Sequence, residues 1–218
     1  MQNSQIIFLS KGLPKTRTYN SAEYHSGIWK ESATEFYVEK NIISGDDVAN
    51  HDYHGGKDRV VCFYPYEHYT YWEKEFGLEL TQSAFGENVT ATNMKEDQVF
   101  IGDIFQMGDA ILQVSQGRYP CATINIRNEN PRLLKKIIET GYTGYFFRVM
   151  KEGRITTESQ ITKLSSLPNA ISVAEIHQLY FHEKAPTSEA IQKILDVPEL
   201  AGRWRELLFD LKMKIDLS

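Results

Sequence analysis

Short apolar runs separated by turn residues dominate the first three quarters of the chain. The runs lie at Ile6–Leu9, Phe36–Val38, Val60–Tyr64, Asp103–Met107, Ile111–Ser115, Tyr145–Met150 and Gln160–Leu164. Gly-Asp steps at residues 45–46, 102–103 and 108–109 stand between several of them, as expected of loops that join strands. Short, numerous strands favour a barrel or a sandwich over a parallel sheet with crossover helices. We therefore predict a mainly β domain over residues 1–165.

Two helices are predicted between these strands. The first has Pro65 at its first helical position, where a missing backbone N–H does no harm. Its apolar face consists of Tyr69, Trp72 and Phe76. The second runs from Pro131 to Thr140, with apolar residues at helical spacing and Gly141 as its C-terminal stop.

After the last apolar run the pattern becomes helical. Residues 172–175 have the form of a capping box, Thr187 caps a second short helix, and Pro198 begins a third. The third helix carries an apolar stripe formed by Leu200, Trp204, Leu207, Leu208 and Leu211. We expect this stripe to pack on the sister helices or the barrel, with a homodimer or donor-protein contact as the alternative. The sequence thus predicts a three-helix unit at residues 170–218, joined to the barrel through residues 165–170.

The composition narrows the class of protein. A chain of 218 residues, 41% of them hydrophobic, can bury a substantial core. Its net charge of −5 argues against a general nucleic-acid binder, which needs clustered lysine and arginine. The apolar runs are too short for a signal peptide or a transmembrane helix, and two cysteines make no disulfide framework. We therefore expect a cytoplasmic protein without membrane association, in which both thiols are reduced.

The densest polar cluster is His51–Arg59, which leads directly into an apolar strand. Gly55 and Gly56 let backbone N–H groups approach an anion closely, because no Cβ blocks the approach. The side chains that add donors or positive charge around the same turn are His54, Lys57 and Arg59. This pattern predicts a site for a phosphate or another oxyanion. A hairpin with solvated charges at its tip is the alternative.

Other chemistries fit the sequence poorly. His51 and His54 have a tolerable spacing for zinc, but Cys62 and His68 are the nearest further ligands and complete no paired zinc motif. The chain also carries no Gly-x-Ser-x-Gly elbow of serine hydrolases, and neither the dinucleotide nor the P-loop glycine fingerprint occurs.

A second polar cluster, at residues 115–121, ends in a cysteine. Pro120 restricts the backbone, so that Cys121 is displayed on a stiff loop after a strand. Arg118 can supply positive potential that favours the thiolate, the form that attacks electrophiles and binds metals. Cys62 lies in an apolar strand and is expected to be buried and inert. A purely structural role for Cys121 is the alternative to a reactive one.

The third polar segment is Phe85–Thr90, in which a glycine precedes polar residues at the start of a strand. The amide of Asn88 can donate and accept hydrogen bonds at once, and would do so in a pocket if the segment faces one. An ordinary turn is the alternative.

These segments, in this order, resemble the MOSC family, named for the carboxy-terminal domain of molybdenum cofactor sulfurases. The resemblance rests on Gly45-Asp46, His54–Arg59, Phe85–Thr90, Gly102–Phe105 and Gln116–Cys121, and it extends to the three-helix tail of the stand-alone YiiM-like branch. It implies a closed or partly closed β-barrel of the pyruvate kinase β-barrel-like type with a few helices. Gly117 stands where the YiiM-like pattern has proline, so we expect a less rigid loop.

The resemblance also implies roles for individual residues. Cys121 would ligate molybdenum or carry sulfur. The residues implied to hold a molybdopterin-type cofactor are His54, Gly55, Gly56, Lys57, Arg59, Asn88 and Arg118. Such roles require His54 and Cys121 to meet in the folded chain.

Three functions follow as hypotheses. The leading one is a molybdenum-dependent reductase of small N-hydroxylated compounds, such as base analogues. It needs a separate electron-donor protein, because the chain carries no flavin, haem or iron–sulfur motif. The second is a non-enzymatic carrier of sulfur or of the cofactor, with a persulfide on Cys121. The third is an interaction module whose helical tail docks a partner.

Overall fold

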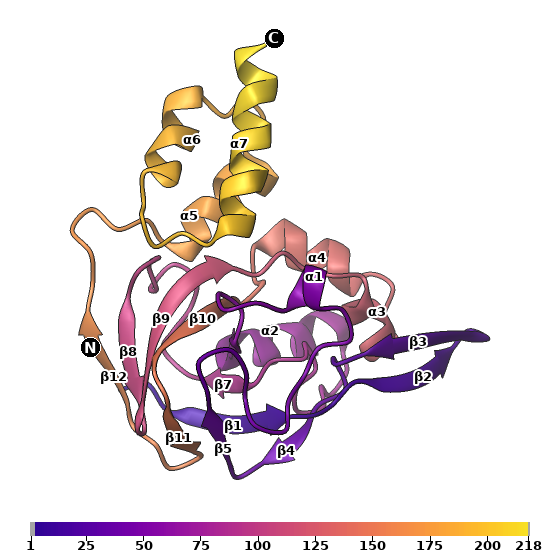
Figure 1. Ribbon diagram of the computed structural model, residues 1–218. Helices are drawn as coiled ribbons and strands as arrows, with labels where there is room; N and C mark the ends of the chain where they lie inside the picture. The colour runs from indigo at the N-terminus through magenta and orange to yellow at the C-terminus, as the bar shows by residue number, and fades with distance from the viewer. Residues whose placement is uncertain (1–2, 218) are drawn as a thin grey trace.

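The computed structural model describes residues 3–217, and its centre is a strongly curved sheet (Figure 1). Eight strands follow the order β12-β8-β9-β10-β6-β7-β1-β4, with β6 and β7 parallel and the other neighbours antiparallel. Their bounds are β1 Ile6–Lys11, β4 Glu31–Ala33, β6 Val61–Pro65, β7 Val89–Ala91, β8 Ile104–Met107, β9 Ala110–Gly117, β10 Tyr145–Lys151 and β12 Ile161–Ser165. An isolated bridge between Gln5 and Gln160 links the two sides of the sheet, which therefore forms a partly closed barrel.

Two short ribbons complete the β structure. They pair β2 (Lys15–Tyr19) with β3 (Ala22–Ser26), and β5 (Glu35–Val38) with β11 (Gly153–Thr156). All seven predicted apolar runs overlap a strand, so the mainly β, partly closed barrel is confirmed. The strands β2, β3, β4 and β11 were not predicted, because none of them contains an apolar run.

Four helices lie among the strands: α1 His51–His54, α2 Tyr66–Phe76, α3 Thr123–Arg127 and α4 Leu133–Thr140. The predicted helices are α2 and α4. Pro65 is the last residue of β6 and the N-cap of α2, so its prediction as the first helical residue is wrong by one position. Gly141 ends α4 as predicted, with a φ of 73° that glycine adopts readily. No helix within residues 3–217 is long and apolar enough to cross a bilayer.

After β12 the chain forms the helical unit at the top of Figure 1. It consists of α5 Val173–His177, the π-helical turn η1 Gln178–His182, α6 Ser188–Leu195 and α7 Gly202–Asp216. The capping box of residues 172–175 and the Thr187 cap are both present. The prediction that Pro198 begins the third helix is wrong. The chain first turns back to the barrel, where Ala201 N donates to Ser115 O of β9 at 3.0 Å, and α7 begins only at Gly202.

The apolar stripe of α7 packs inside the chain. Leu200, Trp204 and Leu208 are buried in the same core as the barrel strands, and Leu207 and Leu211 pack against it. One continuous core therefore joins the helical unit to the barrel, which fixes the position of the two relative to each other.

The helical unit is attached at Gly117, the last residue of β9. Trp204 Nε1 donates to Gly117 O at 2.7 Å. A Cβ added at Gly117 would lie 2.2 Å from Nε2 of the buried His177 side chain. The missing side chain therefore does not loosen the chain here, contrary to expectation, because it lets the His177 ring pack directly on the backbone.

We predict that Gly117→Ala lowers the free energy of unfolding by about 1–3 kcal/mol, because the added methyl group must displace His177. Gly202→Ala is the matched control, since a Cβ there meets nothing within 4 Å. Urea unfolding of both variants measures the effect. A Gly117→Ala protein as stable as the parent would show that His177 does not pack against this backbone.

Candidate functional site

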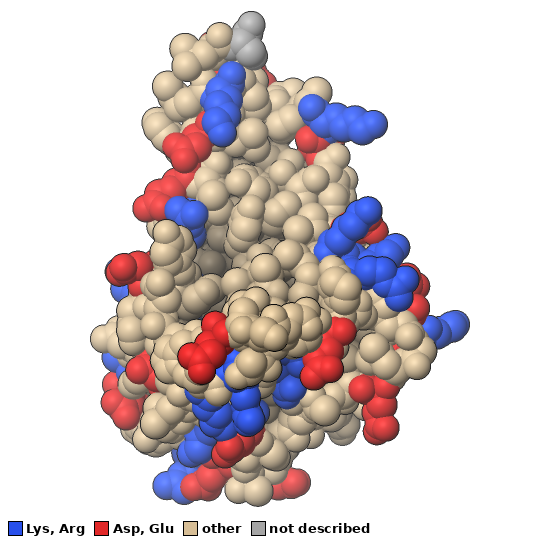
Figure 2. All heavy atoms as spheres, turned by 90° about the vertical axis from the view of Figure 1, so that its right-hand side faces the viewer, with Lys and Arg blue, Asp and Glu red and all other residues tan. Residues whose placement is uncertain are grey.

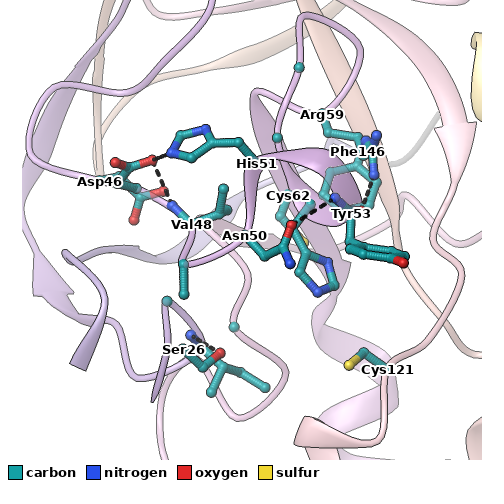
Figure 3. A pocket seen from close by; sticks show the side chains of 18 of the residues that line it. Ser26, Asp46, Val48, Asn50, His51, Tyr53, Arg59, Cys62, Cys121 and Phe146 are labelled. Atoms are coloured by element: carbon teal, nitrogen blue, oxygen red, sulfur yellow. Dashed lines mark hydrogen bonds and ion pairs between the residues drawn. The ribbon is translucent and has the colours of Figure 1, made fainter. Parts of the chain in front are cut away.

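A cavity of about 660 Å³ lies between the barrel and the foot of the helical unit. Its walls come from β3, the segment after β5, α1 and the following loop, the end of β9 with its loop, and the start of α7. The face seen in Figure 2 is hollowed just below the helical unit, and Figure 3 shows side chains that line the cavity. Of the predicted site residues, His54, Gly55, Gly56, Arg59, Asn88, Arg118 and Cys121 line this cavity, and Lys57 does not.

Cys121 lies on the loop after β9 with its sulfur at the cavity wall (Figure 3). Thr123 Oγ1 is 3.2 Å from the sulfur. The side chain of His54, at the end of α1, acts on the same thiol. These contacts, with His54 contributing most, lower the pKa of the Cys121 thiol to about 6, although partial burial opposes them. The thiolate is therefore the major form at neutral pH. The structure brings His54 and Cys121 together, as every reactive role of Cys121 requires.

A short capped helix positions His54. The Asn50 side chain accepts from Asp52 N at 3.1 Å and Tyr53 N at 3.3 Å, which satisfies two free donors at the start of α1. His54 is the last residue of α1, and its backbone N donates to Asn50 O at 2.9 Å. Arg59 donates to Tyr53 O, which ties the following loop back to the helix.

Arg118 acts on the other cysteine. Its Nη1 donates to Cys62 Sγ at 3.7 Å. Burial raises the pKa of the Cys62 thiol, and the positive charge of Arg118 opposes that increase. The side-chain contact of Arg118 is thus with Cys62, and the largest contribution to the low pKa of Cys121 comes from His54. Within residues 3–217, Arg118 pairs with no carboxylate, so its charge is available to a ligand.

The diglycine turn contributes less than predicted. Gly55 N donates to His51 O at 3.0 Å, so this N–H closes α1 and does not face an anion. Lys57 is exposed and lies outside the cavity wall. Gly56 has a φ of 101°, and its carbonyl accepts from Arg59 N at 2.9 Å. The turn thus serves mainly to bring the side chains on either side of it to the cavity.

Asn88 belongs to a buried polar network. It is 3% exposed, its Nδ2 donates to Ser10 O at 3.2 Å and to Asp46 Oδ2 at 3.0 Å, and its Oδ1 accepts from Cys62 N at 3.0 Å. Asp46 also pairs with the Lys30 ammonium group, and both side chains are almost fully buried. The amide donors of Asn88 are therefore committed to the protein, and the residue shapes the cavity instead of offering free donors to a ligand.

The cavity wall also contains polar residues that were not predicted, among them Lys30, Gln116 and Arg203. Gln116 is 3% exposed, and its Oε1 has no hydrogen-bond partner within the described part of the chain. A buried amide oxygen without a partner is costly, so a donor group on a bound ligand would stabilise it. The signal for Gln116 was its place in the Gln116–Cys121 pattern, whereas Lys30 and Arg203 lie in no motif.

Positive charge exceeds negative charge in the cavity wall. The cations are Lys30, Arg59, Arg118 and Arg203, and the carboxylates are Asp46 and Asp47. Asp46 is neutralised by Lys30, and Asp47 lies 3.2 Å from His51 Nε2. The arginines remain, in a chain whose net charge is −5. This local excess suits an anionic ligand.

Comparison with known proteins identifies the family of the chain. A family model described as the MOSC domain matches residues 50–162, which include α1, Arg118 and Cys121. The chain belongs to the MOSC family. A second model, described as a YiiM-like 3-alpha helix domain, matches residues 171–210, the part that contains Arg203.

Individual relatives cover most of this MOSC protein. It is 37% identical to YflK of Bacillus subtilis over 92% of this chain and 90% of that one. The crystal structure of YiiM from Geobacillus stearothermophilus superposes with a TM-score of 0.80 at 34% identity, covering 95% of this chain and 98% of that one. A protein of Gibberella moniliformis named "Reductase" is 40% identical over 56% of this chain, a stretch that makes up 22% of the fungal protein.

We predict that alkylation of Cys121 by iodoacetamide follows a titration with its midpoint near pH 6, fast above it and slow below. His54→Gln should move the midpoint toward the ordinary thiol range, because it removes the contact that contributes most to the low pKa. His51→Gln, on the same helix, is the matched control. Mass spectrometry of the Cys121 peptide gives the rates. An unshifted midpoint in His54→Gln would show that another group stabilises the thiolate.

Proposed function

We propose that this protein binds a molybdenum cofactor and reduces small N-hydroxylated compounds with electrons from a separate donor protein. The observation that carries the proposal is the Cys121 thiol, whose pKa of about 6 leaves it as a thiolate at the wall of a cavity lined by surplus arginines. A soft anionic sulfur suits a transition metal, and the arginines suit the phosphate of a pterin cofactor.

The cavity fits such a group on several counts. Its volume of about 660 Å³ falls within the range of roughly 300–1,000 Å³ that is typical of small-molecule sites. The unpartnered Oε1 of Gln116 would accept a hydrogen bond from an N–H of the pterin or of the substrate. Within residues 3–217 no three His, Cys, Asp or Glu side chains gather as a metal site, so the metal would have to arrive with its own organic ligand.

Each residue of the site would have a defined task. Cys121 Sγ would bind the molybdenum, and Thr123 would hold the sulfur in place. Arg59 and Arg118 would hold anionic groups of the cofactor, and the bound cofactor would supply the two electrons of the reduction. Conversion of N–OH to N–H also consumes two protons and releases water. His54, which acts on Cys121 at the same wall of the cavity, would deliver one of these protons to the departing oxygen.

One relative supports the proposal of a reductase through its name. The fungal protein named "Reductase" shares a segment with this chain, but that segment is 22% of its length, so its name describes a larger protein. The absence of flavin, haem and iron–sulfur motifs from the sequence is the reason for proposing a separate donor.

The second candidate, a sulfur or cofactor carrier, rests on the same thiolate. A persulfide on Cys121 would be an anion too, and the His54 contact that lowers the thiol pKa would stabilise it. In that case the cation-rich cavity would protect the sulfur or bind the cofactor only for transfer. The intact mass decides between the two, because a carrier gains the mass of one sulfur, and a reducing agent removes it.

We predict that protein purified from a host that makes the cofactor contains molybdenum and reduces N-hydroxylated bases when a donor system is added. Cys121→Ser should lower this activity on the order of a hundredfold or more, because a hydroxyl group at neutral pH provides no anionic soft ligand. Metal analysis and a reductase assay measure both quantities. Active protein without molybdenum, or full activity in Cys121→Ser, would rule the proposal out.

A further inference from the structure

One cavity cation comes from outside the barrel. Arg203 lies in the first turn of α7, yet it lines the same cavity as Arg59, which follows α1. Burial lowers the pKa of Arg59, the positive charge of Arg203 lowers it further, and the carboxylates of Asp58 and Glu206 oppose the decrease. Two like charges, one from the barrel and one from the helical unit, thus line one cavity and act on each other. The carboxylate that Arg203 contacts is Glu206, on its own helix, at 3.2 Å.

Arg203 contributes little to the stability of α7, so its position at the cavity needs another explanation. Its ion pair with Glu206 joins side chains that are 50% and 67% exposed, and exposed pairs of this kind contribute little to stability. A cation in the first turn also opposes the positive end of the helix dipole. Arg205 is different, because its guanidinium donates to the carbonyls of Leu195, Val197 and Leu200 and so holds the start of the helix.

We propose that Arg59 and Arg203 together bind the phosphate-bearing end of the ligand, so that the three-helix unit completes the binding site. The ligand's identity as a pterin phosphate rests on the function proposed above. A phosphate bound by both guanidinium groups would offset their repulsion. It would accept hydrogen bonds from the N–H groups that Tyr53 O and Glu206 leave free. Arg203 would then have the role that the sequence predicted for Lys57, which lies outside the cavity wall.

The position of the other groups agrees with this assignment. Arg118, which directly follows β9, contacts Cys62, and Gln116, whose Oε1 has no partner, lies near the end of β9. Cys121 and His54 stand at the wall formed by α1 and the loop after β9. The ligand would therefore have its metal end at Cys121 and its anionic end at α7. Binding would join the barrel and the helical unit through one charged group.

The test compares Arg203→Gln with Arg154→Gln. Arg154 is a matched control, because it is also exposed and pairs with one carboxylate, that of Glu35, but lies outside the cavity wall. Protein from a cofactor-producing host is oxidised, and the released fluorescent pterin is measured per chain. Cofactor-free protein is titrated calorimetrically with inorganic phosphate at low salt. Arg203→Lys separates the charge from the paired hydrogen bonds.

We expect Arg203→Gln to retain roughly a fifth of the parent pterin and to bind phosphate roughly fivefold more weakly, as one lost charged contact would cause. Arg154→Gln should match the parent in both measurements, and Arg203→Lys should fall between. Equal pterin retention and equal phosphate affinity in the parent and Arg203→Gln would overturn the inference and leave the proposed function standing.

The proposed function can also fail while the paired-arginine site remains. A parent protein that holds no pterin would sink the proposed function. If its phosphate affinity still fell in Arg203→Gln, the paired arginines would remain an anion site for another phosphorylated ligand. Absence of both pterin and phosphate binding in the parent would overturn both proposals.

Discussion

The effect of the His54 side chain on the pKa of the Cys121 thiol is the interaction on which the site depends. A thiol on a partly buried loop would otherwise stay protonated, because burial disfavours the charged form. Thr123, at the start of α3, forms a hydrogen bond with the sulfur. The larger effect comes from His54, on a helix that is distant in the sequence. The chemistry of this cysteine is therefore a property of how two segments meet.

The barrel and the helical unit together hold those segments still. Gly117 is bound by Trp204 and covered by His177, and Arg118 N donates to Gly144 O at 3.0 Å, so the cysteine loop leaves β9 from a fixed point. The opposite wall is fixed by the buried Lys30–Asp46 ion pair. Breaking a buried pair by removing one partner costs about 3–5 kcal/mol in proteins, because an uncompensated charge remains. The cavity is thus a stiff part of the molecule that can favour one ligand geometry.

Local sequence patterns, such as apolar runs and a glycine at a helix end, predicted most of the strands and helices that were found. Six of the seven apolar runs became strands with buried side chains, and the seventh became β12, whose Ile161 packs partly buried against the core. Helix α4 ended where glycine could adopt positive φ. The β2–β3 ribbon was missed because its residues are mostly exposed and its turn, Asn20-Ser21, uses two positive φ values of 48° and 63° without a glycine. Pro198 predicts a helix start from the sequence alone. Only the contact of Ala201 with β9 shows that the chain turns before α7 begins.

By itself, the sequence determined that the chain is mainly β with a helical tail, that it carries a cysteine on a proline-stiffened loop, and that basic residues lie near glycines. These are matters of periodicity and of neighbours along the chain, which act over a few residues. Only the tertiary structure decided that His54 serves Cys121, that Arg118 faces Cys62, that Lys57 stays outside the cavity and that Arg203 enters it. Electrostatic and hydrogen-bond partners are set by distance in space, and these pairs are brought together by the curvature of the sheet and the docking of α7.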